Sequence, residues 1–207
     1  KALHERDWTF RQEESPGIGG TVATRLGDVS PAAQERRLAH WTQVREELDG
    51  IDAGALTAAE RIDYVIFRDQ IDQRLADLRH KAWQMPMNSD SSFFAGVAMM
   101  PDRTALRTRE DADAYLARLA DIPRHFDQQI ANMRAGIEDG RTIPKVVMLG
   151  RDAAAAKHAD VERVEDSVFW QPLTRLPSAW SDEDRAALQA RARTLITEEV
   201  LPAYGRV

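Results

Sequence analysis

The histidines are the residues of this chain that could most directly support metal or acid–base chemistry. His4-Glu5 begins like the zinc-peptidase pattern His-Glu-x-x-His, in which two histidines on one helix face bind the metal and the glutamate activates water. The second histidine position holds Trp8, so the pattern is not completed. A carboxylate-bridged di-iron bundle needs Glu-x-x-His twice, and the nearest match is a single Asp77-x-x-His80. The spacing therefore predicts no metal ligand and no catalytic residue in this chain.

Other catalytic patterns are also incomplete. Asp121 and His125 stand at i and i+4, which suits an acid–base pair but is more often a surface ion pair. There is no Gly-x-Ser-x-Gly elbow, and the glycine-rich stretch 17–20 lacks the Lys-Ser/Thr that a phosphate-binding loop requires. With no cysteine, the chain has no disulfide, thiolate zinc site or cysteine nucleophile. We therefore expect no cofactor in this chain.

The composition and net charge of the chain limit the classes of molecule that it can be expected to bind. The 207 residues are 43% hydrophobic and 30% charged, with a net charge of -6, which is typical of a folded domain rather than a disordered one. Duplex nucleic acid is not an expected partner, because phosphate binding needs a basic surface. Arg36-Arg37, beside Glu35, is interpreted as a solvated helix face. No run approaches the ~20 apolar residues that a membrane helix needs, so no membrane span is expected.

The sequence predicts that most elements of the chain are helices, so helices must position any functional site. N-cap patterns at Ser30-Pro31, Thr57 with Glu60, Thr108 with Asp111, and Ser181 with Asp184 predict four helix starts. The predicted helices cover 2–14, 31–49, 58–83, 109–121, 122–139, 153–164 and 182–207, with a kink or break near Leu201 because Pro202 follows. On the third of these, the apolar residues predict one core-facing side: Ile62, Val65, Ile66, Ile71, Leu75 and Leu78.

The predicted fold class is all-α, an irregular array of about six to eight helices with long connections, forming one helical region over residues 1–207. The best strand signal, Lys145 to Leu149, is too isolated to build a sheet. The last helical pattern is still amphipathic at Val207, which favours a piece of a longer protein. Residues 84–107 join two helices and are too apolar for disorder, so they either line a cleft or fill the helical core.

Several segments in order resemble a bacterial family known as domain of unknown function 885. They are spread over almost the whole chain, in the order of the family: 5–16, 26–28, 62–67, 85–88, 115–119, 122–130 and 200–204. The closest are Tyr115-Leu-Ala-Arg-Leu119 and the stretch from Ile122-Pro-Arg-His-Phe126 to Ile130. No single piece is specific, whereas the ordered set is. One departure is the segment after Met85-Pro-Met-Asn88, which is usually polar or glycine-containing in the family and apolar here.

The resemblance implies a longer, largely helical protein that is often exported or lipid-anchored, so a periplasmic or exported location is expected and a cytoplasmic one stays open. It also implies a zinc metallopeptidase whose His-Glu-x-x-Pro-Gly-His-His segment lies beyond this chain. Zinc is thus expected in the full-length parent and not in these residues. The expected function is that of a non-catalytic N-terminal helical part, which walls the substrate cleft and packs on the absent C-terminal catalytic region.

Four residues are candidates for facing that cleft. Asn88 and Gln128 could hydrogen-bond a peptide backbone, and Phe93 and Phe94 could pack against substrate side chains. Two rival interpretations stay open: a stand-alone helical protein-interaction module whose apolar loop binds a partner, and a complete enzyme with dispersed catalytic residues. A chain separated from its catalytic region could also form a homodimer through the face meant for that region.

Overall fold

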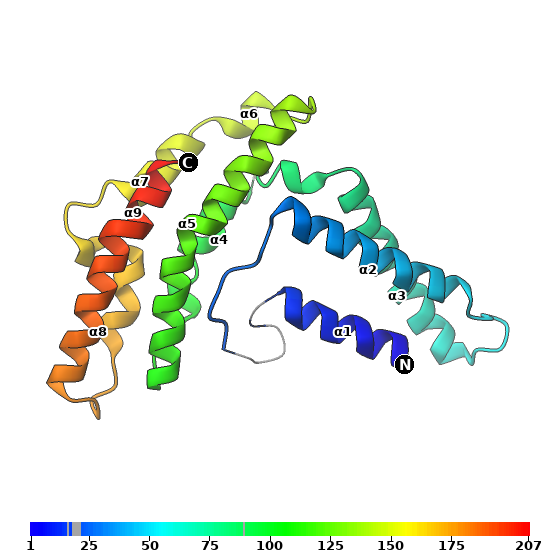
Figure 1. The fold of residues 1–207 in the computed structure, drawn as a ribbon, viewed down its shortest axis with the longest axis horizontal. Helices are drawn as coiled ribbons and strands as arrows, with labels where there is room; N and C mark the ends of the chain where they lie inside the picture. Colours follow the sequence, from blue (N-terminus) through cyan, green and yellow to red (C-terminus); the bar gives the residue numbers. More distant parts are fainter. Residues whose placement is uncertain (16, 18–21, 89) are drawn as a thin grey trace.

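In the computed structural model of the chain, which describes residues 1–15, 17, 22–88 and 90–207, the described residues are 72% helical and contain no strand (Figure 1). The helices are α1 Ala2–Glu14, α2 Pro31–Asp49, α3 Ala58–Arg79, α4 Phe93–Ala98, α5 Arg109–Glu138, α6 Lys145–Met148, α7 Arg151–Ala159, α8 Asp182–Leu195 and α9 Leu201–Gly205. Short 3-10 helices lie at Ala82–Gln84, Pro101–Arg103, Val164–Asp166 and Val168–Arg175. Since α8 and α9 run on through a π turn at Ile196–Val200, eight helices result in the described part, and the all-α prediction is confirmed.

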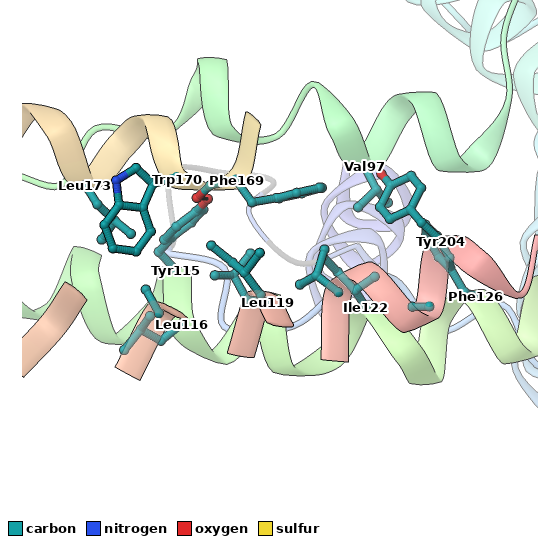
Figure 2. Close-up of a cluster of buried hydrophobic side chains, with 14 of the residues drawn as sticks. Val97, Tyr115, Leu116, Leu119, Ile122, Phe126, Phe169, Trp170, Leu173 and Tyr204 are labelled. Carbon is teal, nitrogen blue, oxygen red and sulfur yellow. Dashed lines mark hydrogen bonds between the residues drawn. The ribbon is translucent and has the colours of Figure 1, made fainter. Parts of the chain in front are cut away.

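The helices pack around two hydrophobic cores. The smaller core joins α1, α2 and α3 and contains Trp41, Val44, Leu48, Ile71 and Leu75. The larger core is built on α5 and buries the aromatic rings of Tyr115, Phe126, Phe169 and Tyr204. In Figure 1, α5 stands between the α1–α3 group and the group formed by α7, α8 and α9. Figure 2 shows Tyr115, Leu119 and Ile122 following one another along α5 in the larger core.

The four predicted helix starts are confirmed. Ser30 accepts a hydrogen bond from Ala33 N–H, with Pro31 at the first helical position. Thr57 with Glu60 and Thr108 with Asp111 both form reciprocal capping boxes. Ser181 accepts from Asp184 N–H. Such caps satisfy backbone donors that have no partner inside the helix, and they depend only on neighbours in sequence.

The prediction of two helices on either side of Pro123 is wrong, because α5 is one helix of 30 residues, about 45 Å long. Proline at an interior position removes one backbone hydrogen bond and costs about 3 kcal/mol. The apolar face offsets that cost, since Leu119, Ile122 and Phe126 are all fully buried on either side of Pro123. Burial of this face therefore holds the helix together across the proline.

The kink or break predicted near Leu201 corresponds to a π turn, through which the helix continues. The backbone N–H of Leu201 bonds to the carbonyl of Ile196, five residues earlier, and α9 begins there with Pro202 in its first turn. A proline ring clashes with the carbonyl four residues before it in a regular α-helix. The wider turn is a known way to insert such a residue without ending the helix.

Other helix ends differ from the predicted ones. The third helix ends at Arg79 rather than Trp83, because Lys81 adopts a left-handed backbone conformation (φ 53°) and a 3-10 turn follows. The helix predicted over 153–164 covers Arg151–Ala159. Lys145–Leu149, the best strand signal, is mostly the helical turn α6, bounded by Pro144 and by Gly150 at φ 76°. Pro16 and residues 18–21 lie outside the described residues, and with them most of the glycine-rich stretch 17–20.

The predicted core face of α3 is only half correct. Ile71 and Leu75 are buried, but Ile62, Val65 and Ile66 are 61, 57 and 52% exposed. The reason is that the first half of α3 packs against the small core through other side chains of its own, Tyr64 and Phe67. Within 84–107, in contrast, Met87, Phe94, Val97 and Leu106 all enter the larger core. That segment therefore fills the core with most of its apolar side chains.

Candidate functional site

The densest polar arrangement of the described chain lies where residues 26–29, here called the strap, cross α5. The strap leads into α2, whose N-cap is Ser30. The side chains that hold it lie at spacings of three, four and seven residues, so they share one face of α5. They are Asp121, Arg124, His125, Gln128 and Asn132, which we call the α5 ladder.

The ladder binds the strap almost entirely through its backbone. Leu26 N–H donates to Asp121 Oδ2 at 2.7 Å, and Arg124 donates to Leu26 O at 3.0 Å. His125 Nδ1 lies 3.0 Å from Gly27 O. Two amides complete the set, with Val29 N–H donating to Gln128 Oε1 at 3.0 Å and Asn132 Nδ2 donating to Val29 O at 2.8 Å. These bonds depend on an extended backbone and not on which side chains the strap carries.

Charges in the ladder reinforce these bonds. Burial alone would raise the pKa of Asp121, but hydrogen bonds from Arg124 and Leu26 N–H outweigh it and hold that pKa below its ordinary value. The same pair raises the pKa of Arg124, chiefly through its hydrogen bond to Asp121. On the strap, bonds from Ser30 and Gln128 likewise outweigh burial and lower the pKa of Asp28. The ladder therefore holds ionised carboxylates next to a fixed guanidinium at neutral pH.

His125 contributes as a neutral ring. Burial lowers its pKa, more than the carbonyl of Gly27 raises it. Because that carbonyl can only accept, Nδ1 is the protonated ring nitrogen. The spacing suggested an acid–base pair or an ion pair between Asp121 and His125. In the structure each side chain has another partner: Asp121 accepts from Arg124 at 2.6 Å, and His125 bonds the strap. The pair is a structural clamp rather than a proton-transfer dyad.

Arg36 and Arg37 complete this clamp from the side of α2. Arg37 donates to Asp28 O at 2.6 Å and forms an ion pair with Glu14 at 3.0 Å, while only 14% of its side chain is exposed. Arg36 reaches Glu14 at 3.3 Å. The interpretation of this pair as a solvated face is therefore wrong for Arg37. Its partners are Glu14 at the end of α1 and Asp28 in the strap, and neither is a sequence neighbour of Arg37.

A second buried polar cluster holds α1 against α2. The carboxylate of Asp7 is 1% exposed and accepts from Trp41 Nε1 at 3.0 Å. His40 Nε2 lies 3.2 Å from the same oxygen, and Arg11 Nε lies 3.0 Å from the other. The ring of His40 stacks on Phe10 at 3.6 Å. Every member packs or bonds within the small core, so this cluster stabilises the helix pair.

The four predicted cleft residues do not gather at one surface. Asn88 is exposed, but its side-chain oxygen accepts from Asp90 N–H and Ser91 N–H within its own turn. Phe94 is buried and Phe93 is half-buried with its ring edge-on to Phe126. Gln128 does bond a peptide backbone as its residue type suggested, but the backbone is that of the strap.

A hollow of the described surface lies elsewhere, between α1, the end of α2, the α2–α3 connection and the first half of α3. This hollow, the α1–α3 groove, has a volume of about 700 Å³. Ile66 belongs both to the groove and to the exposed set Ile62, Val65 and Ile66, which we call the α3 stripe. Among the described residues no three histidine or carboxylate side chains come together as metal ligands. Also within them, no helix is both long and apolar enough to cross a membrane.

The chain is similar to known bacterial proteins, both in sequence and in its all-α fold. Residues 13–207 match the model of a family described as "Bacterial protein of unknown function (DUF885)", and the chain belongs to that family. A comparison with curated proteins finds no match. Among solved structures, one from Colwellia psychrerythraea, described as a "putative lipoprotein", is similar with a TM-score of 0.76 at 14% identity. The similarity covers 98% of this chain and 38% of that one, so this chain spans well under half the length of that relative.

Proposed function

We propose that this chain is the non-catalytic helical part of a zinc-dependent, peptidase-like hydrolase. In that role it packs on a catalytic region supplied by further residues of a longer protein and forms one wall of the substrate cleft. The resemblance of the sequence supports the class of enzyme. The length of the Colwellia psychrerythraea relative, of which this fold is 38%, supports the presence of a further region.

The α3 stripe is the observation that carries the proposal. Ile62, Val65 and Ile66 stand at i, i+3 and i+4, the spacing of a helix face that packs on a neighbour. Each is more than half exposed, although the opposite face of α3 is packed in the small core. Large exposed apolar patches mark interaction surfaces more often than chance positions. The stripe is thus the face on which we place the catalytic region.

The cleft wall itself would be shaped by the interior of this chain. Asn88 is the candidate whose side chain reaches the surface and could meet a substrate. Phe93, Phe94 and Gln128 would act indirectly, because they hold the 85–98 segment and the strap on α5. The zinc would be held by residues outside this chain and would supply an activated water. An exported location is part of the same proposal, supported by the description of the Colwellia psychrerythraea protein.

The experiment is a comparison of two lengths of the same protein, the 207-residue chain and the longer gene product. Val65→Asp is introduced into each, with Val146→Asp as the matched control, since Val146 is also an exposed valine on a helix at 73% exposure. We expect Val65→Asp to lower the melting temperature of the longer protein by several degrees and to leave the 207-residue chain unchanged. Val146→Asp should change neither.

Equal melting temperatures for the longer protein with and without Val65→Asp would contradict this docking face. If the longer protein is unaffected but the 207-residue chain alone binds another protein through the stripe, the interaction-module interpretation replaces ours. The interaction-module function depends on the same exposed residues of the α3 stripe. The comparison of the two lengths therefore distinguishes that function from the proposed one.

A further inference from the structure

The α1–α3 groove is lined by apolar and by charged side chains, and the apolar set is here called its floor. The floor includes Leu3, Leu48, Leu56, Tyr64 and Phe67. Leu48 is buried and the others are half-buried; of these, Leu3, Tyr64 and Phe67 pack against the small core. The volume of about 700 Å³ is in the range of clefts that enclose a ligand or several side chains. An apolar occupant would complete the burial that the small core leaves unfinished.

Charge distinguishes this groove from an ordinary hollow. Its lining carries the carboxylates of Glu5, Glu60 and Asp63 against two ammonium groups, the side chain of Lys1 and the amino group of the same residue, which acts on Glu60. Lys1 pairs weakly with Glu5 at 4.0 Å, with 92% of the lysine side chain exposed. Glu60 is ionised, because hydrogen bonds from the side chain and backbone of Thr57 lower its pKa. An occupant with its own carboxylates would be repelled, whereas one with basic groups would be attracted.

We propose that the α1–α3 groove binds an amphipathic helical segment whose apolar face is flanked by lysine or arginine. The inference rests on the proposed function, because it assigns this segment to the further region that covers the α3 stripe. Ile66 lines the groove and belongs to the stripe, so one helix laid along α3 reaches both. This is the helix-in-groove mode of recognition, in which anchors at helical spacing enter an apolar channel.

The probe is a synthetic amphipathic helix of leucine and lysine, titrated against the 207-residue chain and followed by fluorescence anisotropy. A second peptide has glutamate in place of every lysine. We expect binding of the lysine peptide that weakens as salt is added, and no measurable binding of the glutamate peptide. Binding of both peptides with equal affinity, or of neither, would overturn the inference.

Two variants locate the site. Ile66→Glu should weaken the lysine peptide at least tenfold, since it places a charge on the apolar floor. Asp63→Lys should weaken it about fivefold, as expected for reversal of one exposed charge. The matched control is Asp102→Lys, which makes the same charge change at an exposed aspartate outside the groove. Equal losses for Asp63→Lys and Asp102→Lys would show attraction to net charge alone and overturn the assignment.

Light scattering of the chain without peptide tests the other occupant, a second copy. A dimer that Ile66→Glu abolishes would overturn the proposed segment in favour of self-association. Failure of the peptide tests, together with loss of stability by Val65→Asp in the longer protein, would reject the basic helical segment as the occupant of the α1–α3 groove. The docking face would then stand, so the two proposals can fail separately.

Discussion

The side-chain oxygen of Gln128 accepts a hydrogen bond from the backbone N–H of Val29 at 3.0 Å, across 99 residues of sequence. The amide nitrogen of the same side chain donates to Asp28 Oδ1 at 2.9 Å. Because Val29 immediately precedes the N-cap of α2, this side chain fixes where α2 begins relative to α5. One glutamine thus connects the α1–α3 group to the helix that carries the larger core.

Replacing that glutamine should destabilise the fold. Gln128→Ala leaves the half-buried Val29 N–H without its partner, which costs about 1–3 kcal/mol in the free energy of unfolding. The measurement is urea denaturation followed by circular dichroism. Gln43→Ala is the matched control, because Gln43 bonds the neighbouring Glu47 on an exposed helix face and should lose less than about 0.5 kcal/mol. Equal losses for both variants would contradict the clamp.

Stability should fall as the pH drops below about 6.5, the pKa of an unperturbed histidine. Burial lowers the pKa of His125 in the folded chain, so below about 6.5 the unfolded chain binds more protons than the folded one. The free energy of unfolding therefore decreases with falling pH over that window. His158, whose pKa burial also lowers, acts in the same direction.

The contribution of His125 can be isolated with His125→Asn, which keeps a donor for Gly27 O but does not titrate. Urea denaturation between about pH 5 and pH 8 should show a shallower pH dependence for the variant than for the parent chain. An unchanged slope would mean that His125 is solvated in the folded state. Asp28 and Asp121 act separately at lower pH, because their lowered pKa values give stability that is lost only as they are protonated.

Two buried tyrosines should matter through their hydroxyl groups. Tyr204 donates to Phe94 O at 2.8 Å and Tyr115 donates to Phe169 O at 2.6 Å, and both side chains are almost fully buried. Tyr204→Phe and Tyr115→Phe each remove a buried hydrogen bond, at a cost of about 1 kcal/mol in the free energy of unfolding. Tyr64→Phe, in the half-buried lining of the groove, is the control and should change the free energy of unfolding little. A neutral Tyr204→Phe would contradict the link between α9 and α4.

Local signals in the sequence predicted the helix starts because caps join residues three positions apart. Thr57 with Glu60 and Ser181 with Asp184 could be recognised without any tertiary information. The continuity of α5 through Pro123 could not, since it depends on burial of the flanking side chains against other helices. The exposure of Ile62 is a similar case, because helical spacing shows that a face is apolar and not which neighbour covers it.

Prediction of the candidate site was limited in the same way. Gln128 was predicted to hydrogen-bond the backbone of a substrate, whereas in the structure it bonds the backbone of the strap, far away in sequence. Arg37 and Asp7 were missed as structural residues, since a charged side chain on a helix is usually solvated. Their burial follows from the packing of α1 on α2 and on the strap, and no short pattern encodes it.

The central claim is that this chain supports hydrolysis without performing it. The most direct measurement is peptide hydrolysis with added zinc, compared between the 207-residue chain and the longer gene product at equal concentration. We predict turnover that a chelator abolishes for the longer protein and none above the buffer rate for the 207-residue chain. Chelator-sensitive turnover by the 207-residue chain would mean that this chain carries its own catalytic groups, and it would contradict the central claim.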